Sequence, residues 1–264
     1  MRRASRTIKA VTQRRIHDLN ARTIQFAGAG GDLIEGFLAQ PTDVEDVPSV
    51  VQIHHLPGYD QATKEMALKF ASHGYAVLVP NLYSREAPDA APDDAAAIVR
   101  AQGGVPDDRL VGDVDGAVRH LRALPGATGK VGVIGHCSGG RQAFLSACRL
   151  KLDVAVDCYG AFVVGTPPAG SGLKMQPVVE LAPSLSCPLL GLFGAEDKFP
   201  SSSHVAELAG ALRAAGKDFE FHSFDGAGHG FFSVDRPNYR VDAANQGWEF
   251  IFDFFGRHLG GAKL

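Results

Sequence analysis

The stretch Val131-Gly132-Val133-Ile134-Gly135-His136-Cys137-Ser138-Gly139-Gly140 decides the fold of this 264-residue chain. An apolar run typical of a buried strand leads into a Gly-x-Cys-x-Gly turn, and a helix-like segment, 141–147, follows it. A strand, a tight turn and a helix in this order form a nucleophile elbow. The glycines on either side of Cys137 are required because a Cβ there would clash where the strand and the helix cross.

Cys137 is the predicted nucleophile of this elbow. A helix that begins just after Cys137 adds backbone N–H groups and a positive dipole end, and both favour a thiolate over a thiol. A free cysteine is also commonly a small buried apolar side chain, so the turn alone does not decide between the two roles. Ser138 is a poorer candidate, because a nucleophile at that position would need glycines at other places.

The composition is that of a soluble globular protein, with 45% hydrophobic residues, 21% charged residues and a net charge of −3. We therefore expect no nucleic-acid partner. No apolar run approaches the roughly 18 to 20 residues of a membrane span. The four cysteines are widely spaced and form no Cys-x-x-Cys pair, so we expect no zinc site, reduced thiols and a cytoplasmic location.

Residues 1–22 differ in charge from the rest of the chain, with seven Lys and Arg residues and one acidic residue. Arg2-Arg3 is not followed by an apolar region or a small-residue cleavage site, so we expect no secretory signal. We predict a basic N-terminal arm over 1–22 and a single domain over 23–264; the arm is either a solvated helix or a segment that binds an anionic surface or a second subunit through self-association.

Strand-like and helix-like segments alternate along the predicted domain. A glycine-rich turn at 28–32 joins two alternating segments, 23–27 and 33–40, and predicts an antiparallel hairpin. Strands are predicted over 48–54, 75–79, 130–134, 154–158, 188–193 and 219–224, and helices over 65–73, 107–124, 201–215 and 239–258. The connections 80–106, with a weak helical pattern over 94–100, and 160–187 are expected to be irregular, and the second could form a lid. This order predicts an α/β fold with a mostly parallel central sheet, helices on both faces and the ligand site at the carboxyl ends of the strands.

Two later polar segments supply partners for Cys137. Asp197 follows the strand predicted over 188–193, and His229 follows the strand over 219–224. Nucleophile, acid and histidine in this chain order, each after a successive strand, are typical of the α/β-hydrolase fold. His229 would take the thiol proton, and Asp197 would hold the ring and stabilise its positive charge. Glu196 is a competing acid, whereas Asp225 is a poorer one because it is so close in sequence to His229.

Attack by the cysteine creates an oxyanion that requires two N–H donors. The elbow geometry predicts the backbone N–H of Ser138, the residue after the nucleophile, and that of Leu56, in the loop after the strand over 48–54. Removal of one such donor typically costs about 3 kcal/mol of transition-state stabilisation.

Over roughly residues 47–255 the chain resembles the dienelactone hydrolases. Five segments carry the likeness: Ile53-His54-His55-Leu56-Pro57-Gly58; His73-Gly74-Tyr75 with Pro80-Asn81-Leu82-Tyr83; Gly129-Lys130-Val131-Gly132 with the elbow; Gly194-Ala195-Glu196-Asp197; and Ala227-Gly228-His229-Gly230-Phe231. The resemblance implies a triad of Cys137, Asp197 and His229, no metal, and hydrolysis of an enol-lactone or related ester through an acyl-thioester.

The chain departs from this family at residues that would contact the thiol or the substrate. The family has a glutamate, which partners the thiol and controls its ionisation, where this chain has His55. His55 could pair with the thiolate or point elsewhere and support the loop. The family also holds the substrate carboxylate with two arginines; one matches Arg85, whereas the other falls on Ser233. With apolar Phe231 and Phe232 nearby, this loss predicts an altered or less anionic substrate.

The sequence therefore predicts a cofactor-independent cysteine hydrolase that acts on small lactones or esters. One alternative is thioester or amide hydrolysis by the same triad. Another is a non-catalytic relative that binds a small ligand or a partner, although such a protein has no need to keep Cys137, Asp197 and His229 together.

Overall fold

The computed structural model describes residues 18–42 and 44–260 and contains a central sheet of eight strands. The strands are β1 (Leu19–Ala27), β2 (Leu33–Pro41), β3 (Val47–Ile53), β4 (Ala76–Pro80), β5 (Ala127–His136), β6 (Val154–Cys158), β7 (Leu189–Gly194) and β8 (Phe219–Phe224). Their order in space is β1-β2-β4-β3-β5-β6-β7-β8, so β3 and β5 lie in the middle. Both central strands are apolar and β3 is buried throughout, as expected for strands covered on both faces.

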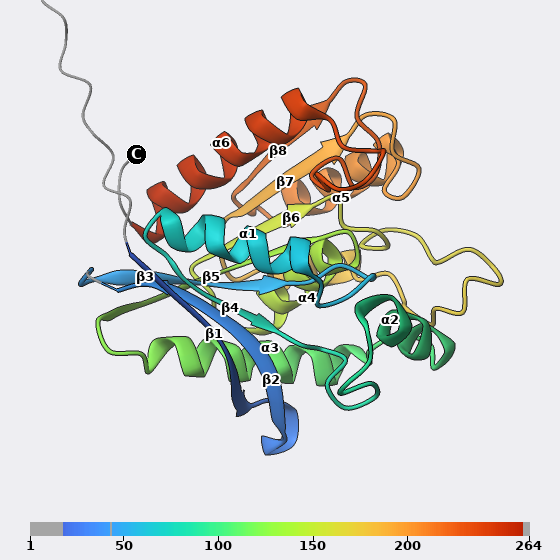
Figure 1. Ribbon diagram of the computed structural model, residues 1–264. Coiled ribbons are helices and arrows are strands. Elements are labelled where there is room, and N and C mark those ends of the chain that lie inside the picture. The colour runs from blue at the N-terminus through green and yellow to red at the C-terminus, as the bar shows by residue number, and fades with distance from the viewer. Residues whose placement is uncertain (1–17, 43, 261–264) are drawn as a thin grey trace, which may run out of the picture.

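Most of the sheet is parallel. β1 pairs with β2 and β2 with β4 in antiparallel fashion, whereas β4, β3, β5, β6, β7 and β8 all run in one direction. The predicted N-terminal hairpin and mostly parallel sheet are confirmed. Because the parallel strands share one direction, the loops that follow them meet at one edge of the sheet (Figure 1).

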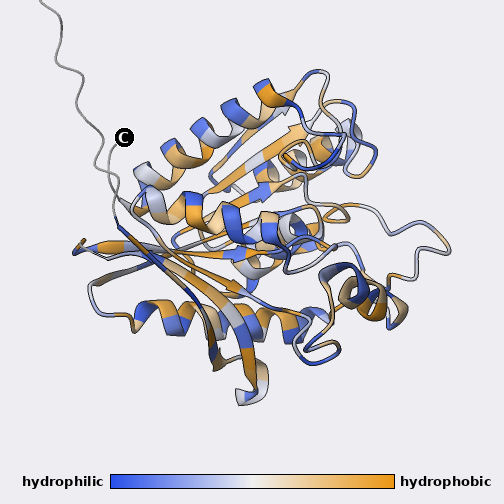
Figure 2. Ribbon diagram, viewed as in Figure 1, coloured by the Kyte–Doolittle hydropathy of each residue, from blue (hydrophilic) through white to orange (hydrophobic). Residues whose placement is uncertain are grey.

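Helices cover both faces of the sheet (Figure 1). The helices are α1 (Gln61–Ser72), α2 (Pro92–Ala101), α3 (Asp107–Arg122), α4 (Ser138–Arg149), α5 (Ser202–Ala214) and α6 (Val241–Leu259), and short 3₁₀ turns lie at Ala29–Gly31 and Val179–Ser184. Apolar side chains of α1 and α6 pack in one core, and those of α2, α3, α4 and α5 pack in the other. Their outer faces are hydrophilic, as Figure 2 shows.

Some element boundaries differ from the sequence-based expectation. β1 begins at Leu19, so the last four residues of the predicted basic arm belong to the sheet, and residues 1–17 lie outside the described residues. α1 begins four residues earlier than expected, because the Asp60 carboxylate accepts a hydrogen bond from the Thr63 N–H and caps the helix. The weak pattern in 94–100 corresponds to α2, which has Pro92 at its first position.

The turn between β5 and α4 has no room for side chains at its glycines. A Cβ on Gly135 would lie 1.9 Å from the carbonyl oxygen of Gly139, and a Cβ on Gly139 would lie 2.6 Å from the carbonyl oxygen of Ile53. Cys137, between them, has φ 57° and ψ −123°, a strained backbone conformation for a residue with a side chain.

Among the residues given above, no helix has both the length and the apolar character needed to cross a membrane.

We predict that Gly135→Ala lowers the free energy of unfolding by at least about 3 kcal/mol, because the clash involves backbone that cannot move aside. Gly210→Ala is the matched control: Gly210 lies in α5 with nothing within 4 Å of the added methyl, so stability should rise by about 0.5 to 1 kcal/mol. Urea denaturation of both variants checks this, and equal stability of the two would contradict it.

His136 provides a prediction about pH. Its ring is buried among Phe232, Trp248 and Tyr159, and burial lowers its pKa to about 3. In the unfolded chain a histidine has a pKa near 6.5 and binds a proton below that pH, whereas the buried ring stays neutral. The free energy of unfolding therefore falls as the pH drops below about 6.5. At pH 5 the loss is about 2 kcal/mol.

The variant His136→Phe has no proton to bind at this site, and a cavity of about 20 Å³ beside the ring gives space for the larger side chain. Between pH 7.5 and pH 5 its free energy of unfolding should fall by about 2 kcal/mol less than that of the wild type. An equal fall in the free energy of unfolding of the variant and the wild type between these two pH values would show that His136 does not titrate in this way.

Candidate functional site

Cys137 lies between the end of β5 and the start of α4, at the edge where the parallel strands end. Its backbone N–H donates to the Cys158 carbonyl at 3.0 Å and ties the turn to the neighbouring strand β6. The sulfur accepts hydrogen bonds from the backbone N–H groups of Ser138 and Leu56. The two backbone donors predicted from the sequence therefore both face the sulfur.

His229 and Asp197 come together at the same edge. Asp197 Oδ2 accepts a hydrogen bond from His229 Nδ1 at 2.8 Å, and its other oxygen accepts from the Phe199 N–H at 2.8 Å. The imidazole also hydrogen-bonds to the Cys137 sulfur. The side chain of Asp197 is buried, whereas Glu196, the competing acid, is exposed.

The charges of this group support one another. Burial raises the pKa of the Cys137 thiol, but the hydrogen bond and positive charge of His229, with the two backbone N–H groups, bring it below its ordinary value. Burial lowers the pKa of His229, but Asp197 and the sulfur raise it to about 10. Each group therefore favours the charged form of the other, a thiolate beside an imidazolium.

Tyr159 is a site residue that the sequence analysis missed. It is buried directly after β6, has a positive φ of 44°, and its ring meets the His229 ring edge-on at 5.2 Å between centroids. Phe231 packs behind Tyr159 at 5.1 Å. Phe231 is 0% exposed and packs against Tyr159, so this geometry favours a supporting role for Phe231 over the substrate contact expected from the sequence. No sequence signal marked Tyr159, since a tyrosine at a strand end is common.

His55 points away from the thiol. Its Nε2 lies 2.7 Å from Oδ2 of Asp60, whose other carboxylate oxygen caps α1 through Thr63. Burial raises the pKa of Asp60, but the hydrogen bonds from His55 and Thr63 bring it well below its usual range. Of the two roles left open for His55, this geometry supports the second, in which it holds the loop after β3.

Arg85 lies in an ion-pair cluster away from the thiol. Two of its nitrogens donate to the fully buried carboxylate of Asp113 at 2.9 Å, and Nε donates to Asp32 at 2.9 Å. Asp113 also accepts from the Ala29 N–H at 2.8 Å, so the cluster joins the β1–β2 turn to α3. The geometry favours a structural role for Arg85 over the carboxylate binding that the resemblance implies.

Ser233 is partly buried beside the site. With His55, His136 and Tyr159 it lines the cavity of about 20 Å³. The Nε2 atom of His136 and the Oε1 atom of Gln52, two buried polar atoms without a hydrogen-bond partner among the described residues, belong to the lining of the same cavity. Ser233 therefore lines the same cavity as His55, and its contact with substrate stays a prediction.

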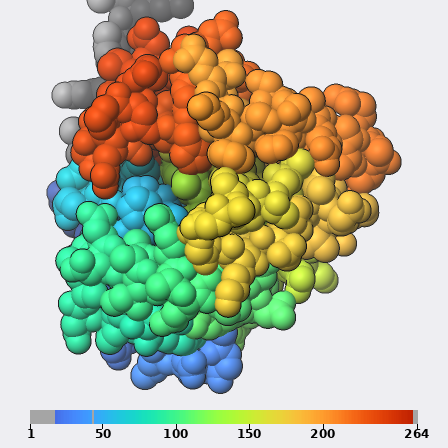
Figure 3. Space-filling view, turned by 90° about the vertical axis from the view of Figure 1, so that its right-hand side faces the viewer, coloured from blue at the N-terminus to red at the C-terminus, as the bar shows by residue number. Residues whose placement is uncertain are grey.

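Two long connections flank this edge of the sheet. The connection 160–187 is tied to the segment after α2, since the Lys174 N–H donates to the Gly103 carbonyl at 2.9 Å. The buried Arg141, four residues after Cys137, donates to Asp107 at the start of α3 and to the Gln176 carbonyl. Figure 3 shows the surface where residues 80–105, coloured teal to green, meet the yellow connection and the orange segments after β7 and β8.

No group of three or more His, Cys, Asp or Glu side chains that could hold a metal ion occurs within residues 18–42 and 44–260. The groups that meet at this edge are the Cys137 sulfur, the His229 imidazole, the Asp197 carboxylate and the two backbone N–H donors.

The chain is similar to known proteins over most of its length. The model of the "Dienelactone hydrolase family" matches residues 34–259. A Methylorubrum extorquens protein named "Putative carboxymethylenebutenolidase" is 30% identical over 229 residues, which cover 86% of this chain and 77% of that protein. A Bradyrhizobium protein named "Probable 2-oxo-3-(5-oxofuran-2-ylidene)propanoate lactonase" is 27% identical, with 89% and 94% covered. The crystal structure of a "Putative Dienelactone Hydrolase" from Klebsiella pneumoniae has a TM-score of 0.81 and 25% identity, and the match covers 92% of this chain and all of that one. The chain therefore belongs to the dienelactone hydrolase family and is a hydrolase with the α/β-hydrolase fold.

Proposed function

We propose that this protein hydrolyses small lactones or esters with Cys137 as nucleophile, His229 as acid and base, and Asp197 as the group that orients His229. The observation that carries the proposal is the continuous set of hydrogen bonds from Asp197 through His229 to the Cys137 sulfur. The family and the carboxymethylenebutenolidase and lactonase names of its relatives support a lactone as substrate.

Attack begins when the thiolate forms a C–S bond to the carbonyl carbon. The carbonyl oxygen becomes an oxyanion, which the N–H groups of Leu56 and Ser138 would bind in place of the sulfur they contact at rest. When the C–O bond of the ester breaks, His229 gives its proton to the leaving oxygen. In a lactone that oxygen stays attached to the acyl group, so the product of this step is a ring-opened acyl-thioester on Cys137.

Water completes the reaction. His229, now neutral, takes a proton from water as the water oxygen attacks the thioester carbon. Cleavage of the C–S bond releases a carboxylic acid, which loses its proton, and restores the thiolate beside protonated His229. Asp197 keeps the ring in the required orientation throughout, since its Oδ2 binds Nδ1.

A cytosolic location remains a prediction from the cysteines, all four of which are free thiols.

The first test is loss of turnover. Cys137→Ala and His229→Ala should each lower kcat for a panel of activated esters and lactones by at least about 10³-fold, and Asp197→Asn by at least about 10²-fold. Glu196→Gln is the matched control, and its kcat should stay within about threefold of the wild type. Full activity of either alanine variant would exclude the mechanism. Turnover of thioesters or amides but not lactones would favour the alternative substrates, and no turnover with any substrate would favour a binding protein.

The second test is the pH dependence of alkylation by iodoacetamide. Between pH 8 and pH 6 the alkylation of an ordinary thiol of pKa near 8.5 slows by about 80-fold, whereas the alkylation of Cys137 should slow less, because His229 and the two backbone N–H groups lower the pKa of its thiol. His229→Gln should restore the ordinary slope. The other cysteines do not interfere, because burial raises the pKa of Cys148 and of Cys187 to about 12 and also raises that of Cys158. An unchanged slope in His229→Gln would show that His229 does not ionise the thiol.

The third test concerns Arg85. Arg85→Gln should lower the free energy of unfolding by about 3 kcal/mol, because the Asp113 carboxylate loses its partner in a buried position. The ratio of KM values for lactones with and without a carboxylate should stay within about twofold. A rise of tenfold or more in KM for the carboxylate-bearing lactone alone would show that Arg85 binds the substrate.

A further inference from the structure

The peptide group between His55 and Leu56 is held through its carbonyl. The His55 carbonyl oxygen accepts a hydrogen bond from the Gly58 N–H at 2.9 Å and another from His54 Nδ1 at 2.8 Å. The N–H of the same peptide group is that of Leu56, which donates to the Cys137 sulfur. In a trans peptide the C=O and N–H bonds point in opposite directions, so a fixed carbonyl also fixes the direction of the N–H.

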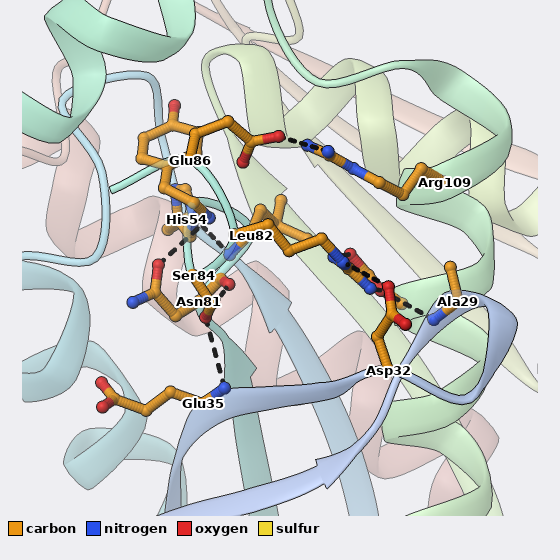
Figure 4. Close-up of polar contacts among 12 residues, drawn as sticks. Ala29, Asp32, Glu35, His54, Asn81, Leu82, Ser84, Glu86 and Arg109 are labelled. Carbon is orange, nitrogen blue, oxygen red and sulfur yellow. Dashed lines mark hydrogen bonds and ion pairs between the residues drawn. The ribbon is translucent and has the colours of Figure 1, made fainter. Parts of the chain in front are cut away.

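His54 can donate from Nδ1 because a donor faces its other nitrogen. The Leu82 N–H lies 3.2 Å from His54 Nε2 (Figure 4). A backbone N–H can only donate, so Nε2 accepts and the ring proton resides on Nδ1. His54 is buried, and burial lowers its pKa to about 4. The ring is therefore neutral, with one tautomer, at any pH near 7.

The segment that carries the Leu82 N–H is itself anchored to β2. The Asn81 N–H donates to the Glu35 carbonyl at 2.8 Å, and the Glu35 N–H donates to the hydroxyl of Ser84. That hydroxyl donates to the Asn81 carbonyl at 2.6 Å (Figure 4). A series of short contacts therefore runs from an antiparallel strand of the sheet to the peptide group beside the nucleophile.

We propose that His54 is a positioning residue: through Nδ1 it orients the His55–Leu56 peptide group so that the Leu56 N–H points at the developing oxyanion. The role rests on the proposed function, because it concerns the oxyanion of that reaction. His54 does not contact the sulfur in this arrangement. The hydrogen bond from His54 prevents rotation of the His55–Leu56 peptide group, which would otherwise turn the Leu56 N–H away from the oxyanion.

Two variants separate this role from a general packing role. His54→Leu fills a similar space but removes the donor to the His55 carbonyl and the acceptor for Leu82. In His54→Asn the side-chain amide nitrogen occupies nearly the position of Nδ1, so the donor to the His55 carbonyl is kept and only the contact with Leu82 is lost. If His54→Leu does not fold, His54→Gln replaces it, because its amide extends toward the position of Nε2.

The leucine variant should have kcat lowered by about 10²-fold, the typical effect of losing one oxyanion donor, and KM within about threefold of the wild type. The asparagine variant should recover kcat to within about fivefold of the wild type. Alkylation of Cys137 by iodoacetamide at pH 7 should slow far less than kcat falls, because alkylation forms no oxyanion and His229, the main cause of the lowered thiol pKa, is unchanged. Unchanged kcat in His54→Leu would overturn the proposal, as would equal losses of kcat in the leucine and asparagine variants.

Failure of the proposed function gives a different result. If the wild-type enzyme remains active after complete alkylation of Cys137, the nucleophile is wrong, whatever the His54 variants show. If alkylation abolishes activity and the kcat of His54→Leu stays normal, the nucleophile is correct and only the positioning role fails.

Discussion

The close contact of two backbone segments without side chains between them governs this structure. Gly135 at the end of β5 faces the Gly139 carbonyl, and Gly139 in the first turn of α4 faces the carbonyls of Ile53 and His54 at the end of β3. Only at this short separation can the chain turn from β5 into α4 within one residue. Cys137 takes the left-handed backbone conformation that the turn requires, and its sulfur lies between the ends of the two central strands.

The same contact places charge-stabilising groups around a buried sulfur. Burial alone favours the neutral thiol, and the imidazolium of His229 and the N–H groups of Ser138 and Leu56 outweigh it. The Ser138 N–H comes from the first turn of α4, whereas the Leu56 N–H belongs to a peptide group whose carbonyl accepts a hydrogen bond from the His54 ring. His229 and Asp197 come from loops after β8 and β7, and Tyr159 from the end of β6, where the parallel strands end together. The proposed chemistry thus depends on the direction of the strands.

Three histidines near the nucleophile have different surroundings and different roles. His54 is buried between a backbone donor and a backbone acceptor, so it is neutral and orients a peptide group. His55 pairs with Asp60 and joins the loop after β3 to the start of α1. His136 is packed among aromatic rings. Neighbouring positions in the sequence therefore do not imply similar chemistry, because His54 and His55 have different partners.

The sequence by itself was enough to predict the mostly parallel sheet with its N-terminal hairpin, the elbow at Cys137, and the loops that carry Asp197 and His229. These features depend on local patterns, namely apolar runs, glycines at a tight turn, and the order of the strands. The start of α1 at Asp60 was also within reach, since an aspartate three residues before Thr63 is an ordinary capping signal. Only the tertiary structure decided what His55, Arg85, Phe231 and Tyr159 contact. His55 pairs with Asp60 only five residues further on, whereas Arg85 and Phe231 contact residues far away in the sequence, Asp113 and Tyr159. The direction of such side chains depends on packing between elements far apart in the chain, which no local pattern records.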